Sequence, residues 1–178
     1  MITVRSERPE DIGAVRRVNE AAFDRSEEAA LVDALRAAAQ PYISLVAERD
    51  GQVVGHIFFS PVTLETDDGA SVIVETAERA PQMLGLAPMA VLPEFQKQGI
   101  GSRLVREGLN ECRRMGCEAV VVLGHPEYYP RFGFVPAGRA GLRSEYPVPD
   151  DVFMVLELKP GALPARGLVK YHPEFGNV

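Results

Sequence analysis

The sequence predicts an α/β (α+β) domain whose mixed, mostly antiparallel sheet holds a central pair of parallel strands and carries helices on its flanks. Residues 83–91 form an apolar segment that is followed by a glycine-containing turn. After the turn, apolar residues recur at helical spacing as far as Met115. A second apolar segment, residues 119–123, follows, and strand–helix–strand in this order predicts a parallel pair with a right-handed crossover. Asp50-Gly51 stands between two strand-like segments, which predicts an antiparallel hairpin.

The first forty residues predict one strand and two helices. Residues 2–5 alternate as a short strand does, and Pro9 opens a helix at a position where its missing N–H costs nothing. A second helix is expected to begin after Ser26, a candidate N-cap, and to end before Pro41. The apolar face expected for the first helix comprises Ile12, Val15, Val18, Ala22 and Phe23.

The next elements surround the central strand–helix–strand unit. Strands are expected over 42–48 and 53–59, more antiparallel strand within 61–82, and a polar loop over Glu75 to Pro81. After Gly116 ends the central helix, Pro130 limits residues 128–132 to a short helix. Closing strands are expected at 134–135 and 152–158, and the tail from Pro160 is expected to have little regular structure.

The whole chain, residues 1–178, is expected to form a single domain, with its motifs in about 2–158 and an irregular tail over 159–178. Its 46% hydrophobic and 25% charged residues are ordinary for a soluble globular protein. A net charge of −6 argues against a nucleic-acid partner and is compatible with a cationic substrate such as an amine.

No apolar run is long enough to span a bilayer, and the N-terminus lacks a signal-peptide pattern. Cys112 and Cys117 are not spaced as metal ligands or as a C-x-x-C pair, so no metal is expected. Cys112 lies on the apolar stripe of the central helix and is expected to be a small buried hydrophobe. A reducing, cytoplasmic location is therefore expected.

The turn between the central strand and helix reads Gln96-Lys97-Gln98-Gly99-Ile100-Gly101. Glycines let a ligand approach the backbone, and the first amides of a helix attract phosphate. No Gly-Lys pair occurs in the chain, which excludes a G-x-x-x-x-G-K-[ST] loop, and Leu104 stands where a dinucleotide fingerprint needs its third glycine. An ordinary strand-to-helix turn, with glycines chosen for geometry, is the alternative interpretation.

The remaining pattern, Q-x-x-G-x-G at Gln96, Gly99 and Gly101, resembles the pyrophosphate-binding motif of the GNAT superfamily of acetyl-CoA-dependent N-acetyltransferases. A second segment, Tyr129 with Gly133-Phe134, resembles the Y-x-x-x-G-F signature near the end of GNAT domains. The two motifs stand in the family's order, and the resemblance covers about residues 2–158, with a small bacterial single-domain branch as the nearest match.

The resemblance implies roles for three groups of residues. Backbone groups of Met89, Ala90 and Val91 would hold the pantetheine arm of acetyl-CoA and offer an N–H to the thioester oxygen. Tyr129 would be the general acid that protonates the departing CoA thiolate. The amides of the turn would hold the pyrophosphate, and the residues implied are Lys97, Gln98, Gly99, Ile100, Gly101 and Ser102.

The sequence departs from the family in one segment, because no Asn precedes Tyr129 where many members carry one against the pantetheine. The strand 83–91 also lacks a carboxylate or histidine, so no base is expected on it. An ordered water remains an open alternative for the general base, as do four side chains in neighbouring segments. These are His56, Glu75, His125 and Glu127.

The resemblance therefore predicts transfer of an acetyl group from acetyl-CoA to a primary amine of a small molecule or of a protein or peptide. A noncatalytic acyl-CoA-binding or interaction module on the same fold is the alternative. The expected partners are acetyl-CoA and the amine, with no nucleic acid and no membrane. The acceptor's identity, the use of other acyl groups and the choice between monomer and homodimer stay open.

Overall fold

The structure is a computed structural model that describes residues 1–66, 71–72, 83–163 and 166–177. The chain folds as two compact units. One is built from residues 1–60, 87–111 and 173–178, and the other from residues 61–86 and 112–172. Strand β6 (Met83–Val91) and helix α3 (Ile100–Arg114) each contribute residues to both units.

The sheet of the first unit orders its strands β1-β2-β3-β6. Strand β2 (Ile43–Arg49) pairs antiparallel with both β1 (Ile2–Ser6) and β3 (Gln52–Pro61). The β2–β3 hairpin turns through Asp50 and Gly51, whose φ angles are 51° and 79°. Two consecutive positive φ angles define the type I′ turn that matches strand twist, so the predicted Asp-Gly hairpin is confirmed.

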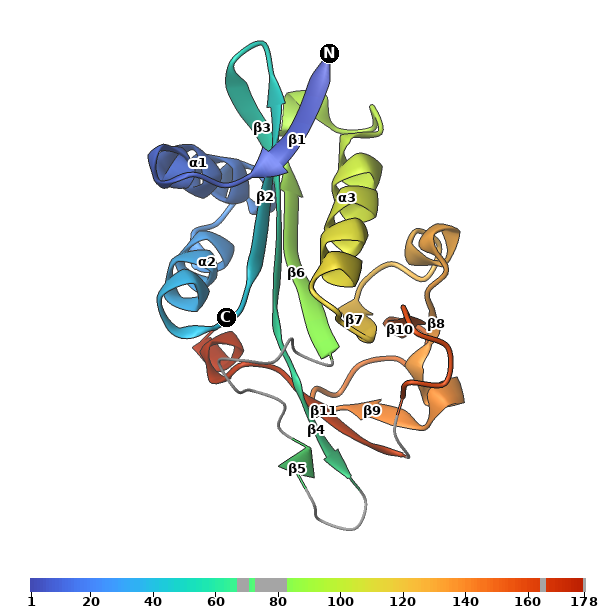
Figure 1. Ribbon diagram of the computed structural model, residues 1–178. Helices are drawn as coiled ribbons and strands as arrows, with labels where there is room; N and C mark the ends of the chain where they lie inside the picture. The colour runs from blue at the N-terminus through green and yellow to red at the C-terminus, as the bar shows by residue number, and fades with distance from the viewer. Residues whose placement is uncertain (67–70, 73–82, 164–165, 178) are drawn as a thin grey trace. The chain divides into compact units, whose positions relative to one another are not determined.

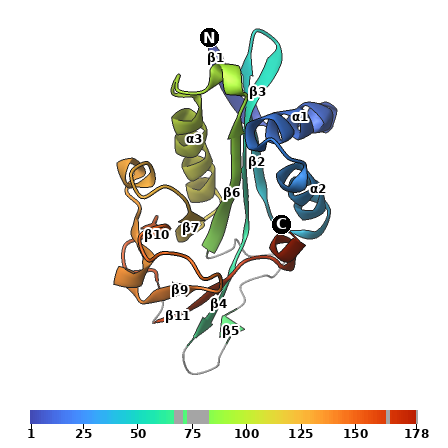
Figure 2. The same cartoon turned by 180° about the vertical axis from the view of Figure 1, so that it is seen from behind.

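Helices cover both faces of this sheet (Figure 1). Helices α1 (Ile12–Phe23) and α2 (Glu27–Ala38), preceded by the short η1 (Pro9–Asp11), lie on one face, and α3 lies on the other. The view from behind shows the same arrangement (Figure 2). The core between the sheet and the first two helices comprises Val15, Val18, Leu31, Val32, Leu35, Ala39, Val46, Val53, Phe58 and Ala90.

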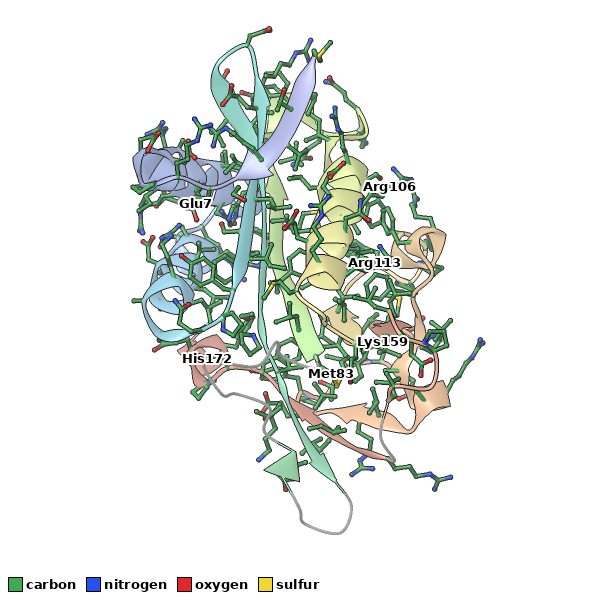
Figure 3. The ribbon with its side chains drawn as sticks, viewed as in Figure 1. Glu7, Met83, Arg106, Arg113, Lys159 and His172 are labelled. Carbon is green, nitrogen blue, oxygen red and sulfur yellow. The ribbon has the colours of Figure 1, made fainter. Side chains whose placement is uncertain are left out.

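Close packing of α3 onto the sheet depends on small residues on both sides. A Cβ added to Gly55 of β3 would lie 3.0 Å from the Leu104 side chain, and one added to Gly108 of α3 would lie 2.4 Å from the Phe59 ring. The stripe predicted for α3 is buried at Ile100, Leu104, Val105, Leu109 and Cys112. Arg106 and Arg113 lie on the exposed side of the helix (Figure 3).

Two buried carboxylates form ion pairs that tie β1 and its following segment to the rest of the unit. Arg5 on β1 contacts the Asp11 carboxylate at 2.7 Å. Glu7, labelled in Figure 3, is 6% exposed and lies 2.5 Å from the Arg36 guanidinium of α2. Because both carboxylates are largely removed from water, each contact supports the position of a helix against the sheet.

The second unit holds the parallel pair. Strand β7 (Ala119–Leu123) runs parallel to β6, from Met83 opposite Ala119 to Leu86 opposite Val122, as predicted. Strand β10 (Phe153–Glu157) pairs antiparallel with β7 and with the short β8 (Val135–Pro136). Gly116, at φ 82°, ends α3, and the Cys117 N–H donates to the Cys112 carbonyl at 3.0 Å, which is a Schellman end.

A second sheet of this unit orders its strands β5 (Ser71–Val72), β4 (Thr63–Thr66), β11 (Gly167–Lys170) and β9 (Leu142–Ser144). Strand β11 pairs antiparallel with β4 and parallel with β9. The remaining short helices are η2 (Pro93–Phe95), η3 (Tyr129–Phe132), η4 (Ala137–Ala140) and η5 (Pro173–Asn177).

The structure corrects three expectations. The tail from Pro160 contains β11 and η5 and is therefore more regular than predicted, since a four-residue strand is stabilised by its partners more than by its own sequence. Ser26 stands at the N-cap of α2, but its side chain makes no capping hydrogen bond. Ile12 and Phe23 are 39% and 37% exposed and so lie at the margin of the α1 face. The loop expected over 75–81 lies outside the described residues.

Within the described part of the chain, no helix combines the length and apolar character needed to cross a bilayer.

Candidate functional site

The turn between β6 and α3 has the backbone geometry of an anion-binding loop. Lys97 and Gly99 have φ angles of 62° and 85°, so the chain twice enters the left-handed region within three residues. The Arg103 N–H donates to the Gly99 carbonyl at 3.1 Å, and the amides of Ile100 and Gly101 therefore precede the helical hydrogen-bond ladder. Amides arranged in this way, at the positive end of a helix, attract phosphate.

Space above the turn is open. A Cβ built on Gly99 meets no atom within 4 Å, so a ligand can approach the backbone there. Lys97 and Arg103 are exposed, and the Arg103 guanidinium donates to the Ile2 carbonyl at the start of β1. These cations place positive charge next to the turn, although the whole chain carries a net charge of −6.

The side chains of two exposed glutamines connect the turn to the end of β6 and to η2. The Gln96 amide donates to the Val91 carbonyl at 2.9 Å, which ties the turn to the end of β6. The Gln98 amide donates to the Glu94 carbonyl at 3.2 Å. Gln96 of the motif thus has a structural task here, because its hydrogen bond connects the turn before α3 to the end of β6.

Arg49 belongs to this site although the sequence did not single it out. Its guanidinium lies over the Phe95 ring, 5.6 Å from the centroid, and donates to Gln98 Oε1 at 3.4 Å. The hairpin between β2 and β3 brings Arg49 to the turn from far away in the sequence. A lone arginine beside an Asp-Gly hairpin carries no signal of that contact, which explains why it was missed.

The residues predicted to hold pantetheine lie at the end of β6. The ladder between β6 and β7 is recorded as far as Leu86, and Pro88, which has no N–H, follows it. Met89 is half-buried, while Ala90 and Val91 are 3% and 9% exposed. The Val91 carbonyl already accepts from the Gln96 amide, so it is not available to an added strand.

Tyr129 lies in the second unit, at the start of η3, and is 6% exposed. Its ring packs edge-on against Phe134 and Tyr128, with centroids 5.7 and 5.1 Å away. The ring also lies directly on Gly124, where an added Cβ would be 2.3 Å from Tyr129 Cε2. Burial, with a smaller contribution from Tyr128, raises the pKa of Tyr129 above its ordinary value, so the phenol keeps its proton at neutral pH.

His56, one of the four candidate bases, is a core residue. It is 0% exposed, and burial lowers its pKa to about 3. The Asn19 amide donates to Nδ1 at 3.1 Å, so Nε2 carries the proton and donates to Ser44 Oγ at 2.8 Å. With both ring nitrogens engaged and no access to solvent, His56 is disfavoured as a base.

The other three candidates are placed differently. His125 and Glu127 are exposed, and the His125 carbonyl accepts the N–H groups of Tyr128 and Tyr129, so this segment shapes the approach to η3. Glu75 lies outside the described residues. Among the residues that the structure describes, no group of three His, Cys, Asp or Glu side chains could hold a metal ion.

Comparisons with known proteins point to one family. The model of the Acetyltransferase (GNAT) family matches residues 12–134. The chain is 37% identical to the uncharacterized N-acetyltransferase YhbS of Escherichia coli K12, with 97% of each chain aligned. It is 42% identical to YjhQ of the same organism over 79% of this chain and 74% of the relative.

Solved structures extend the likeness to the fold. Escherichia coli YhbS in complex with CoA has a TM-score of 0.84 and 35% identity, covering 98% of this chain and 92% of that one. A GNAT family acetyltransferase from Brucella melitensis in complex with acetyl-CoA has a TM-score of 0.77 and 40% identity, covering 98% of both chains. The fold is the GNAT α/β fold, and this chain belongs to the acetyltransferase (GNAT) family.

Proposed function

We propose that this chain transfers the acetyl group of acetyl-CoA to a primary amine of a small molecule or of a protein or peptide. The observation that carries the proposal is the turn from Lys97 to Gly101, where two left-handed residues and the start of α3 create an open cradle of backbone donors. The CoA and acetyl-CoA bound in two related structures support the same donor for this chain.

The residues present fit acetyl-CoA. The amides of Lys97 through Ser102 would contact the pyrophosphate, with Lys97 and Arg49 adding positive charge beside it. The backbone of Met89 and Ala90 would pair with the pantetheine amides as an additional strand. A backbone N–H of this segment would then stabilise the negative charge that develops on the thioester oxygen.

The chemical step needs a neutral amine and a protonated leaving group. The amine nitrogen attacks the thioester carbon, a C–N bond forms, and the C–S bond breaks as the thiolate departs. Tyr129 would give its phenolic proton to that thiolate and then take up a proton from solvent, so that the thiol leaves and the phenol is restored. Since the thiol of CoA has an ordinary pKa of about 8.5, this help is useful but not indispensable. The proton lost by the amine passes to water.

A noncatalytic acyl-CoA-binding module is the second candidate. Tyr129 and the intact Gln96, Gly99 and Gly101 set argue against it, because both motifs resemble those of the acetyltransferases of this family. The two candidates differ in one measurable property: both bind acetyl-CoA, but only the enzyme releases thiol when an amine is added.

The test has two stages on the full chain. Calorimetry first compares acetyl-CoA, CoA, ATP and NAD, and acetyl-CoA is expected to bind while NAD does not. Thiol release is then measured with a panel of α-amino, lysine-like and polyamine acceptors. Binding without thiol release for every acceptor would favour the module, and a failure to bind acetyl-CoA would overturn the proposal.

A further inference from the structure

The C-terminal end of α3 brings the two cysteines of the chain together. Gly116 ends the helix at φ 82°, and the Cys117 N–H donates to the Cys112 carbonyl at 3.0 Å. In this Schellman geometry the residue after the glycine lies against the residue five positions before it, and the contact between the two is usually apolar. Here both positions are cysteine, so the backbone places one thiol beside the other.

The same hydrogen bond limits how far apart the two backbones can be. Standard bond lengths join the Cys112 carbonyl and the Cys117 N–H to their Cα atoms, so these Cα atoms are at most about 7 Å apart. A disulfide spans Cα atoms up to about this distance. The end of α3 therefore meets the backbone requirement for a bond between the two sulfurs.

The two sulfurs are in contact and are covered. Cys112 and Cys117 are 0% and 3% exposed. The Cys112 thiol donates a hydrogen bond to the Cys117 sulfur, and the Cys117 thiol donates to the Ala119 carbonyl at 3.1 Å. The pair is thus held in one arrangement by the helix end and by the first residue of β7.

The two thiols are not equivalent. The hydrogen bond from Cys112 lowers the pKa of Cys117, whereas the same hydrogen bond, together with burial, raises the pKa of Cys112. Cys117 therefore has the greater thiolate character, and the thiolate is the form of cysteine that attacks an oxidant. Cys112 lies next to it as the second thiol.

Access to the pair is through the end of the helix. Arg113, Arg114 and Gly116 stand between the two cysteines in the sequence and are exposed, and Figure 3 labels Arg113. The last turn of a helix opens at a lower free-energy cost than a core segment does. A molecule as small as hydrogen peroxide can then reach Cys117 without global unfolding.

We propose that Cys112 and Cys117 are a redox-sensitive pair, which hydrogen peroxide converts to a reversible disulfide across the end of α3. The Cys117 thiolate attacks a peroxide oxygen, the O–O bond breaks, and a sulfenic acid forms while the departing hydroxide takes up the proton that Cys117 had lost. The Cys112 sulfur then attacks the Cys117 sulfur, the S–S bond forms, and the second hydroxide leaves as water with the Cys112 proton. Two thiols are oxidised, and one peroxide is reduced to two waters. The proposal does not depend on acetyl transfer.

The experiment exposes the folded full chain to hydrogen peroxide, removes the peroxide with catalase, and alkylates free thiols with N-ethylmaleimide in denaturant. The untreated chain is expected to take up two maleimides and the treated chain none, and dithiothreitol should restore both. Trypsin cuts at Arg113 and Arg114, so the disulfide should link peptide 107–113 to peptide 115–131. Mass spectrometry detects this linked pair.

Single variants distinguish the two thiols. In Cys112→Ser, Cys117 should still react with peroxide, but its sulfenic acid has no partner and should be trapped by dimedone. In Cys117→Ser, the remaining thiol should be lost about tenfold more slowly, because burial keeps Cys112 protonated. Met115→Leu is the matched control, since it removes a neighbouring oxidisable sulfur and should leave the disulfide unchanged.

The parent chain alone is enough to overturn the proposal. Uptake of two maleimides after peroxide treatment of the folded chain, a disulfide between two chains, or sulfinic acid without the linked peptides would each do so. Thiol loss as fast in Cys117→Ser as in Cys112→Ser would overturn the assignment of Cys117 as the attacking thiol.

Discussion

Tyr129 combines burial, a raised pKa and close aromatic neighbours, and its neighbour Tyr128 supplies a direct comparison. Tyr128 is half-buried, and its ring lies beneath the Arg131 guanidinium, 4.5 Å from the centroid. This contact holds Tyr128 in a structural position. We therefore expect Tyr129 to donate a proton and the adjacent Tyr128 to have a structural role, and single substitutions can distinguish the two.

Tyr129→Phe should lower the rate of acetyl transfer by a factor of roughly ten to ten thousand and leave acetyl-CoA affinity little changed, because only the proton donor is removed. Single-turnover thiol release measures the rate, and calorimetry measures the affinity. Tyr128→Phe is the control. A larger loss in the control, or full activity in Tyr129→Phe, would contradict the assignment.

His56 provides a second prediction at this scale, and it concerns stability. The pKa of His56 is lowered to about 3 in the folded chain, against about 6.5 when unfolded. Between those values the unfolded chain binds a proton that the folded chain does not, so stability falls as the pH falls. The loss from this group should be about 1.4 kcal/mol per pH unit across that window.

Denaturant unfolding of the parent and of His56→Gln between pH 7 and 4 measures this contribution as a difference in slope. The variant is expected to be less stable at pH 7, since Asn19 and Ser44 lose a buried partner, but its stability should decline less steeply toward acid. If the unfolding free energies of the parent and of His56→Gln changed with pH at the same slope, protonation of His56 would cost the folded chain no stability.

Among elements, the turn of the β6–turn–α3 unit contains one glycine, Gly99, in the left-handed region. Gly99→Ala forces an alanine into φ 85° and puts a methyl group into the open space above the turn. Gly161 offers a matched control, because its φ is 75° and its added Cβ also meets nothing within 4 Å. Both variants should lose about 1 kcal/mol of stability.

The two variants should differ in binding. Gly99→Ala is expected to weaken acetyl-CoA by about tenfold or more, as the methyl group and the altered turn separate the phosphate from its donors. Gly161→Ala should bind as the parent does. Calorimetry measures the acetyl-CoA affinity of both variants. Equal affinities would show that the turn does not bind acetyl-CoA.

Gly124 links the end of β7 to Tyr129. Gly124→Ala must displace the Tyr129 ring, because the new Cβ would lie 2.3 Å from Cε2. The rate of acetyl transfer should fall about tenfold or more while acetyl-CoA affinity is retained, since the acid is misplaced. Gly13→Ala, whose Cβ makes an ordinary 3.6 Å contact, is the control.

A double variant tests whether Gly124 acts through the Tyr129 hydroxyl. Gly124→Ala combined with Tyr129→Phe should be no slower than the slower single variant if both act on the same proton. Additive losses would assign Gly124 a separate role in the stability of η3.

The elements that the sequence predicted well are those with their own local signal. Asp50-Gly51 determines its hairpin, and the β6–α3–β7 unit carries periodicity, a helix-ending glycine and an apolar strand of five residues. The strands β9 and β11 have three and four residues, and they exist because each pairs with the other. No local pattern specifies such a pair.

The features of the candidate site also fall into those with a local sequence signal and those created by the tertiary fold. The Gln96, Gly99 and Gly101 pattern predicted the position of the turn, and the left-handed φ of Gly99 explains why a glycine is favoured there. Arg49 and the support of Tyr129 by Gly124 could not be predicted, because both contacts are created by the tertiary fold. The sequence predicted the residues that we propose for the chemistry, but not the contacts that position them.

At the scale of the whole molecule, the proposed reaction requires an acceptor for the proton that the amine loses. Strand β6 carries no titratable side chain, and His56 is closed to solvent. We therefore expect a water relay, with the rate set by the neutral fraction of the acceptor. An α-amino group with a pKa near 8 should then reach its maximal rate at a lower pH than a lysine-like amine with a pKa near 10.4.

The pH profile of kcat/KM should accordingly rise with an inflection that moves when the acceptor is exchanged, up to the pH at which the acceptor is neutral. Tyr129 should not limit the profile below about pH 10, because its raised pKa keeps it protonated. His125→Ala, Glu127→Gln and Glu75→Gln should each retain activity at a pH where the amine is already neutral. An inflection fixed near pH 6–7 for every acceptor, and lost in one of these variants, would instead identify a dedicated protein base.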